Sequence, residues 1–203
     1  MTVRLRPRRL YERIGNRLSW RITGAALALS LALPFAASGQ TLADPMAATL
    51  LPRYRLISQS FLALAEAMPA DKYTFKPSSG EFQDVRSFGE QVKHVACGNF
   101  GFFNEIEKKT PPAHCETGGP SPAKTKAEIV AYLREAFAYG ERLVDATTAA
   151  NALDPAGGPY GGQSTRLGLI VLAIWHASDH YGQLVVYSRM NGIVPPASRP
   201  APR

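Results

Sequence analysis

The chain has 203 residues, of which 45% are hydrophobic, and a formal net charge of +7. This length suits one domain with an appendage, and the net charge first suggests a nucleic-acid or membrane partner. However, the first 39 residues hold seven arginines and a single acid. The rest of the chain has 16 basic and 15 acidic residues, a net charge of +1. We therefore expect no nucleic-acid partner.

Residues 1–39 have the organisation of a secretory signal peptide. An arginine-rich segment precedes sixteen mostly apolar residues, 22–37, and small residues follow them. Cleavage is expected after Gly39, with Ala37 at position −3, or one or two residues earlier. A transmembrane anchor is the alternative, but this run is interrupted by Pro34 and is shorter than the roughly 20 residues that span a bilayer. We expect a periplasmic or secreted protein with no membrane attachment after cleavage.

The chain has two cysteines, Cys97 and Cys115. In an exported protein an even number of cysteines favours a disulfide, which would add about 2–4 kcal/mol of stability. The alternative is that Cys97 is a free thiol close to a metal ion.

Four segments predict helices, and no stretch alternates with the period of a strand. The first is expected from about Pro52, in its first turn, to Ala67, with Pro69 as the stop. The second begins at the capping box "SFGE", residues 87–90, and ends near Lys108 or Lys109. Apolar residues recur at helical spacing in both: Ile57, Phe61, Leu64 and Met68 in the first, and Phe88, Val92, Val95, Phe102 and Ile106 in the second.

The third helix begins at a second capping box, "TKAE", at residues 125–128. The fourth is expected from about Thr165 to Asn191, with Gly192 as the residue after its C-cap. Residues 40–196 thus predict an all-α domain, most simply a four-helix bundle. Residues 197–203 predict a disordered proline-rich tail.

Two histidines occur four residues apart in the last helix, directly after the apolar run "LGLIVLAIW". His176 and His180 share one face of that helix, and this spacing lets two imidazoles reach one metal ion. His94, beside the apolar stripe of the second helix, is the candidate third ligand. The fourth histidine, His114, lies in a proline-rich loop and is expected to be solvated. Two packed or solvated histidines without a metal remain the alternative.

At this point the sequence resembles the exported, DinB-like members of the DinB/YfiT-like superfamily. The resemblance rests on "HASDHYGQLVVYSRMNGIVPP", residues 176–196, together with "YTFKPSSGEFQDVRSFGEQVKHVA", and it covers roughly residues 48–196. It implies a four-helix bundle with an up-down-down-up arrangement and a divalent metal, commonly nickel or zinc, held by His94, His176 and His180. Because family members are often dimers, it also implies a homodimer as an expected assembly.

An open three-histidine site suits a metalloenzyme, because a bound ion lowers the pKa of coordinated water. Hydrolysis and thiol transfer are the two reactions expected, and the resemblance implies the second. Relatives use cytoplasmic thiols, which an exported protein meets rarely, so the substrate is left as an unknown small molecule. The alternative is a non-catalytic protein that binds metal or in which the metal has a structural role.

Other residues near the histidines are candidates for supporting roles. Asp179, Gln183 and Glu90 are candidates to orient the imidazoles, although Asp179 is more typical of a solvated acid. Trp175 is expected in the core, and Tyr181 is expected to pack.

Overall fold

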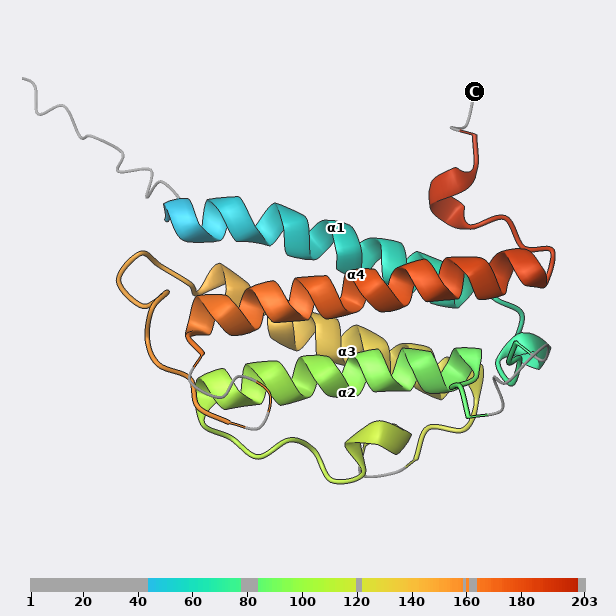
Figure 1. The fold of residues 1–203 in the computed structure, drawn as a ribbon, viewed down its shortest axis with the longest axis horizontal. Coiled ribbons are helices and arrows are strands. Elements are labelled where there is room, and N and C mark those ends of the chain that lie inside the picture. The colour runs from blue at the N-terminus through green and yellow to red at the C-terminus, as the bar shows by residue number, and fades with distance from the viewer. Residues whose placement is uncertain (1–43, 78–83, 120–121, 159, 161–163, 201–203) are drawn as a thin grey trace, which may run out of the picture. The chain divides into compact units, whose positions relative to one another are not determined.

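The computed structural model describes residues 44–77, 84–119, 122–158, 160 and 164–200 (Figure 1). The predicted signal peptide lies outside these residues. In the described part of the chain, no helix combines the length and hydropathy needed to cross a membrane.

The first helix, α1 (Pro45–Ala67), begins seven residues before the predicted start at Pro52. The side chain of Asp44 caps it by accepting a hydrogen bond from the backbone N–H of Met46 at 2.9 Å, and Pro45 occupies the first turn. Pro52 lies inside the helix, so the prediction that it starts the helix is wrong. Because Pro52 has no N–H, the carbonyl of Ala48 loses its helical partner, but both residues are exposed and water can take its place.

The other three helices are α2 (Phe88–Glu107), α3 (Lys126–Asp145) and α4 (Arg166–Met190). Both predicted capping boxes are present, at Ser87 for α2 and at Thr125 for α3. Thr165 caps α4, and Gly192, with φ +72°, follows its C-cap. The described residues contain no strand, only one isolated bridge, so the all-α prediction is confirmed.

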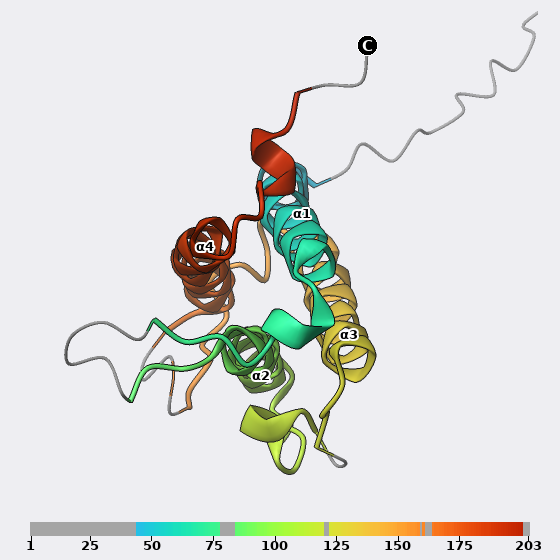
Figure 2. The same cartoon turned by 90° about the vertical axis from the view of Figure 1, so that its right-hand side faces the viewer.

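The four helices form a ring in which each contacts two others: α1 packs on α3, α3 on α2, α2 on α4, and α4 on α1 (Figure 2). Along the chain, α1 and α4 run one way while α2 and α3 run the other, as Figure 1 shows. This is the up-down-down-up order that the resemblance implied. Because α2 and α3 are parallel neighbours, the connection between them, residues 108–125, returns along α2 and includes the 3-10 turn η2 (Cys115–Thr117).

Aromatic side chains fill the centre of the bundle. Tyr54 of α1 is fully buried, and its hydroxyl donates to Asn99 Oδ1 at 2.8 Å and makes a longer contact of 3.3 Å with the carbonyl of Phe137. The ring of Tyr54 packs edge-on against Phe103 of α2. Gly140 of α3 lies directly against Tyr54 and Phe103, so a larger residue there would clash with both. The polar hydroxyl is thus satisfied inside an otherwise apolar core.

The apolar run before the two histidines is buried on one side of α4 only. Leu169, Ile170 and Ala173 are buried, whereas Val171 is 52% exposed and Trp175 is 62% exposed. The prediction that Trp175 belongs to the core is therefore wrong. Two helical positions separate Trp175 from the buried Ala173, which turns it about 200° away around the helix.

The chain stays ordered for a short distance beyond α4. The 3-10 turn η3 (Pro196–Ser198) lies against α1. The tail predicted from residue 197 therefore begins inside an ordered turn, and residues 201–203 lie outside the described chain.

Candidate metal site

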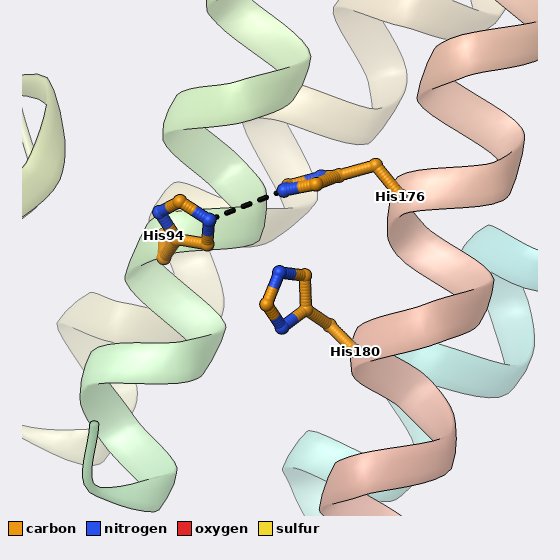
Figure 3. Close-up of side chains that lie close together, drawn as sticks. All are labelled: His94, His176 and His180. Carbon is orange, nitrogen blue, oxygen red and sulfur yellow. Dashed lines mark hydrogen bonds between the residues drawn. The ribbon is translucent and has the colours of Figure 1, made fainter. Parts of the chain in front are cut away.

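His94 of α2 and His176 and His180 of α4 converge in the space between the two helices (Figure 3). Each ring offers one nitrogen, and these three atoms lie within 4.8 Å of one another. The Nε2 atoms of His94 and His176 are 3.2 Å apart, and the ring centroids of His176 and His180 are 4.6 Å apart. We call these three residues the histidine cluster. His114 is exposed, as predicted, and does not belong to it.

The close approach of His176 to α2 depends on Gly98, one helical turn after His94. A Cβ atom at position 98 would lie 2.7 Å from Cε1 and 3.1 Å from Nδ1 of His176. Both distances are shorter than ordinary van der Waals contact. The absence of a side chain at Gly98 therefore makes room for the imidazole.

His94 is oriented by Glu116 from the turn η2. The Nδ1 atom of His94 is 3.1 Å from both carboxylate oxygens of Glu116. Because a carboxylate can only accept hydrogen bonds, Nδ1 carries the proton and donates. The lone pair of Nε2 then points into the histidine cluster, the tautomer that a metal ligand needs.

His180 is oriented by a chain of amides that ends on a carboxylate. Asp179 accepts from Gln183 Nε2 at 2.8 Å, and Gln183 Oε1 accepts from Gln91 Nε2 at 2.8 Å. The remaining oxygen of Gln91 faces His180 Nδ1 at 2.5 Å. Since Asp179 only accepts, the direction of every hydrogen bond in this series of side chains is fixed, and His180 Nδ1 must donate. His180 therefore also presents the lone pair of its Nε2 atom to the cluster.

The environment keeps the imidazoles of α4 neutral. Burial lowers the pKa of His176 to about 3, with smaller contributions from His180, His94 and Arg86. Burial likewise lowers the pKa of His180 to about 4, with further lowering by His94 and Arg86 and partial opposition from Asp179 and Glu116. Neutral imidazoles have the free lone pair that metal coordination requires.

His176 differs from the other two because its second nitrogen has no orienting partner among the described residues. Its Nδ1 atom is buried and makes no hydrogen bond there. The ring is instead held by contact with Gly98 and by an edge-on contact with Phe102, whose centroid is 5.4 Å away. Packing therefore holds the Nδ1 side of this ring, while its Nε2 atom lies 3.2 Å from Nε2 of His94.

The two cysteines form a disulfide between α2 and η2. This decides between the two alternatives left open by the sequence, because a bridged Cys97 has no thiolate to offer a metal. The bridge ties the turn that carries Glu116 to the helix that carries His94.

A pocket of about 440 Å³ lies beside His180. It is bounded by the end of the α1–α2 connection, the first turn of α2 and the C-terminal half of α4. Its lining is mostly polar: Asp84, Val85, Arg86, Gln91, His180, Gln183 and Tyr187. Tyr187 donates to the backbone carbonyl of Arg86 at 3.1 Å and so fastens this wall to α4. The pocket places open space next to the histidine cluster.

Some of the residues that orient the histidine cluster could be identified from the sequence. Gln183 and Asp179 do support His180, although only through Gln91, whose role the sequence did not reveal. Glu90 does not take part, because its carboxylate accepts from the backbone N–H of Ser87 at 2.7 Å in the capping box. Glu116 was also missed, and its place directly after Cys115 was the available signal.

The donor set and spacing fit a divalent transition-metal ion. Two nitrogen ligands at about 2.0–2.1 Å from a tetrahedral zinc ion are about 3.3 Å apart, close to the 3.2 Å between Nε2 of His94 and of His176. Neutral imidazole suits zinc, nickel, copper and iron. The histidine cluster could therefore hold such an ion through His94, His176 and His180.

Comparisons with known proteins agree with this architecture. A solved structure described as a conserved protein from Enterococcus faecalis superposes with a TM-score of 0.55 at 16% sequence identity, covering 71% of this chain and 95% of that one. At this identity the likeness concerns the fold alone. No curated protein matches the chain. The family model of the DinB superfamily matches residues 53–184, which include all of α2 and α3, most of α1 and α4, and all three clustered histidines. The chain belongs to the DinB superfamily.

Proposed function

We propose that this chain is an exported divalent-metal protein whose three-histidine site is open to a small-molecule substrate. The reaction proposed is a hydrolysis or a thiol transfer, and the proposed ion is zinc or nickel. The observation that carries the proposal is the convergence of His94, His176 and His180, with the tautomers of His94 and His180 fixed by neighbouring groups.

The number of protein ligands favours an open site. Structural zinc sites are usually closed by four protein ligands, whereas catalytic sites keep a position for water or substrate. In the described part of the chain, the cluster contains three metal-binding side chains, and Cys97 is held in the disulfide. The pocket of about 440 Å³ beside His180 supplies room for a small molecule.

The chain's own residues would orient the ligands and the substrate. A bound ion would act as a Lewis acid that lowers the pKa of a coordinated water or thiol. Glu116 and Gln91 hold the rings of His94 and His180. Arg86, in the pocket wall, offers a positive charge to a polar or anionic group of the substrate.

Export is proposed from the leader in residues 1–39 and is supported by the disulfide. Disulfides persist in the periplasm and outside the cell and are rare in the cytosol. Mass spectrometry of the protein purified from the envelope fraction should give a mature chain that begins near residue 40. A chain retained in the cytosol with its first residue intact would contradict this part of the proposal.

Elemental analysis tests the metal site directly. Protein purified without a histidine tag is expected to carry, or to take up, about one divalent ion per chain. His94→Ala and His176→Ala should lose the ion, while His114→Ala, which changes an exposed histidine outside the cluster, should keep it. The absence of stoichiometric metal from wild-type protein, before and after incubation with zinc or nickel, would overturn the proposal.

Removal of the metal by a chelator distinguishes an enzyme with an open site from the alternative, a protein in which the ion has only a structural role. An open site predicts that the far-ultraviolet circular dichroism survives removal of the metal, because the bundle core does not depend on the ion. Unfolding on chelation would favour the structural role.

A further inference from the structure

The disulfide and the metal site are connected through one short turn. Cys97 lies three residues after His94, so the two residues are within one turn of α2. Cys115 is the first residue of η2, and Glu116 directly follows it. The same turn that is bonded to α2 therefore carries the carboxylate that contacts His94.

Other contacts fix η2 in the same place. The hydroxyl of Tyr132 on α3 donates to the backbone carbonyl of Cys115 at 3.1 Å. The backbone N–H groups of Gly118 and Gly119 bond to the carbonyls of Cys115 and His114 at 3.2 and 3.1 Å. The turn is thus anchored to α3 by one hydrogen bond and to α2 by a covalent bond.

Glu116 needs this anchoring because its side chain is 56% exposed. An exposed glutamate that pairs with an imidazole gains little energy and loses side-chain freedom, so such pairs are weak when their backbones are free to move. Here the disulfide restrains the backbone within one residue of the carboxylate. The bond between Glu116 and His94 therefore forms at a lower entropic cost.

We propose that the Cys97–Cys115 disulfide acts as a positioning element for the metal site: it holds Glu116 against His94, and metal affinity depends on the intact bridge. Glu116 is a positioning residue, which fixes the tautomer and angle of His94 without touching the ion or substrate. This inference rests on the proposed function, since it takes the histidine cluster as a metal site. It makes the orientation of His94 sensitive to dithiol reductants, which reduce the bridge to two thiols and are themselves oxidised to a disulfide.

The test is a double-mutant cycle on zinc affinity, measured by competition with a chromophoric chelator. Glu116→Ala should weaken zinc binding about 10- to 100-fold, the usual effect of removing a group that orients a metal-bound histidine. The variant Cys97→Ser/Cys115→Ser, which removes the bridge without freeing a thiol that could itself bind zinc, should weaken it within the same range. Glu141→Ala, which removes a partly exposed carboxylate of α3 paired with Arg55, is the matched control and should bind zinc as wild type does.

The cycle separates a shared action from two independent ones. If the bridge acts through Glu116, adding Glu116→Ala to Cys97→Ser/Cys115→Ser should leave zinc binding no weaker than in Glu116→Ala alone. Multiplied losses in the combined variant would overturn the proposal, as would unchanged affinity in Glu116→Ala. Circular dichroism at the assay temperature verifies that each variant is folded, since loss of a disulfide costs stability by itself.

A second readout needs no metal. In metal-free wild-type protein, the nitrogen chemical shifts of His94 should report a proton on Nδ1, as the contact with Glu116 requires. Glu116→Ala and the reduced protein should both lose that preference, whereas Glu141→Ala should keep it. An unchanged His94 tautomer in the reduced protein would refute the link to the disulfide. A wild-type protein that binds no zinc would instead refute the metal site itself, so the two failures are distinguishable.

Discussion

Replacing Gly98 by alanine should damage the metal site while leaving the bundle folded. The added Cβ atom would lie 2.7 Å from His176 Cε1, and ordinary contact begins at 3.4 Å, so the two must separate by about 0.7 Å. Distances from a metal ion to its ligands are held within about 0.2 Å. Whether the ring rotates or α2 and α4 move apart, the nitrogen of His176 leaves the position that suits the other two ligands. We expect zinc affinity to fall at least tenfold, or about 1.4 kcal/mol.

Stability should change much less than affinity in this variant. Alanine in place of glycine inside a helix favours folding by about 1 kcal/mol, and the overlap with His176 costs about 1–3 kcal/mol. The free energy of unfolding should therefore be unchanged or lower by up to about 2 kcal/mol, measured by urea titration of metal-free protein.

Gly182→Ala is the matched control, because it lies in the middle of α4 and an added Cβ there meets nothing within 4 Å. It should gain up to about 1 kcal/mol in stability and bind zinc as wild type does. Gly98→Ala protein that is folded and binds zinc within twofold of wild type would refute the argument that this glycine sets the position of His176.

Two further predictions concern the groups that keep the imidazoles neutral and oriented. Gln91→Met removes the hydrogen-bond acceptor for His180 Nδ1 and keeps a similar side-chain volume. Competition with a chelator should show that zinc affinity is lowered about 10- to 100-fold. An unchanged dissociation constant would mean that Gln91 does not orient the ring. The lowered pKa values of His176 and His180 favour their neutral forms in the folded state, so metal-free protein should lose stability as pH falls from 6.5 towards 3–4. At pH 5, protonation stabilises each of the two imidazoles in the unfolded state by about 2 kcal/mol. We halve the sum of the two because the rings are partly exposed, so the free energy of unfolding should be about 2 kcal/mol lower at pH 5 than at pH 7.5. Urea titrations at the two pH values should show this loss in wild type and a smaller one in the double variant His176→Gln/His180→Gln, and equal losses would contradict the assignment.

Local sequence patterns were sufficient for most of the fold. Both capping boxes use residues three positions apart, and the apolar stripes repeat every three or four residues, so a helix and its buried face are visible in a short window. The same holds for His176 and His180, whose spacing alone places them on one face. Pro52 was misinterpreted because the sequence offers two prolines that suit a first turn, and the earlier one, Pro45, has the better cap in Asp44.

Contacts between distant residues were beyond this reasoning. Gln91 meets His180 across 89 positions and Glu116 meets His94 across 22. Neither pairing follows from a periodic pattern, because each depends on how far α2, α4 and η2 slide past one another in the folded bundle. Trp175 was misplaced for a related reason. A continuous apolar run does not reveal which side of the helix faces a neighbour, and Trp175 lies on the side without one.

The topology of the bundle accounts for the presence of Glu116 at the site. Parallel neighbours such as α2 and α3 cannot be joined by a short loop, and their connection must return along the bundle. Helix α2 has 20 residues and is about 30 Å long, whereas the 18 residues from 108 to 125 could reach about 60 Å when extended. The connection is therefore about twice as long as the return path, which leaves enough chain to fold η2 against α2 beside His94. A connection with that much excess length has many ways to lie on the surface, and the Cys97–Cys115 bond restricts it to the one in which Glu116 contacts the imidazole. Ordering this long connection costs conformational entropy on folding. The same connection also supplies Glu116, which orients the proposed metal ligand His94.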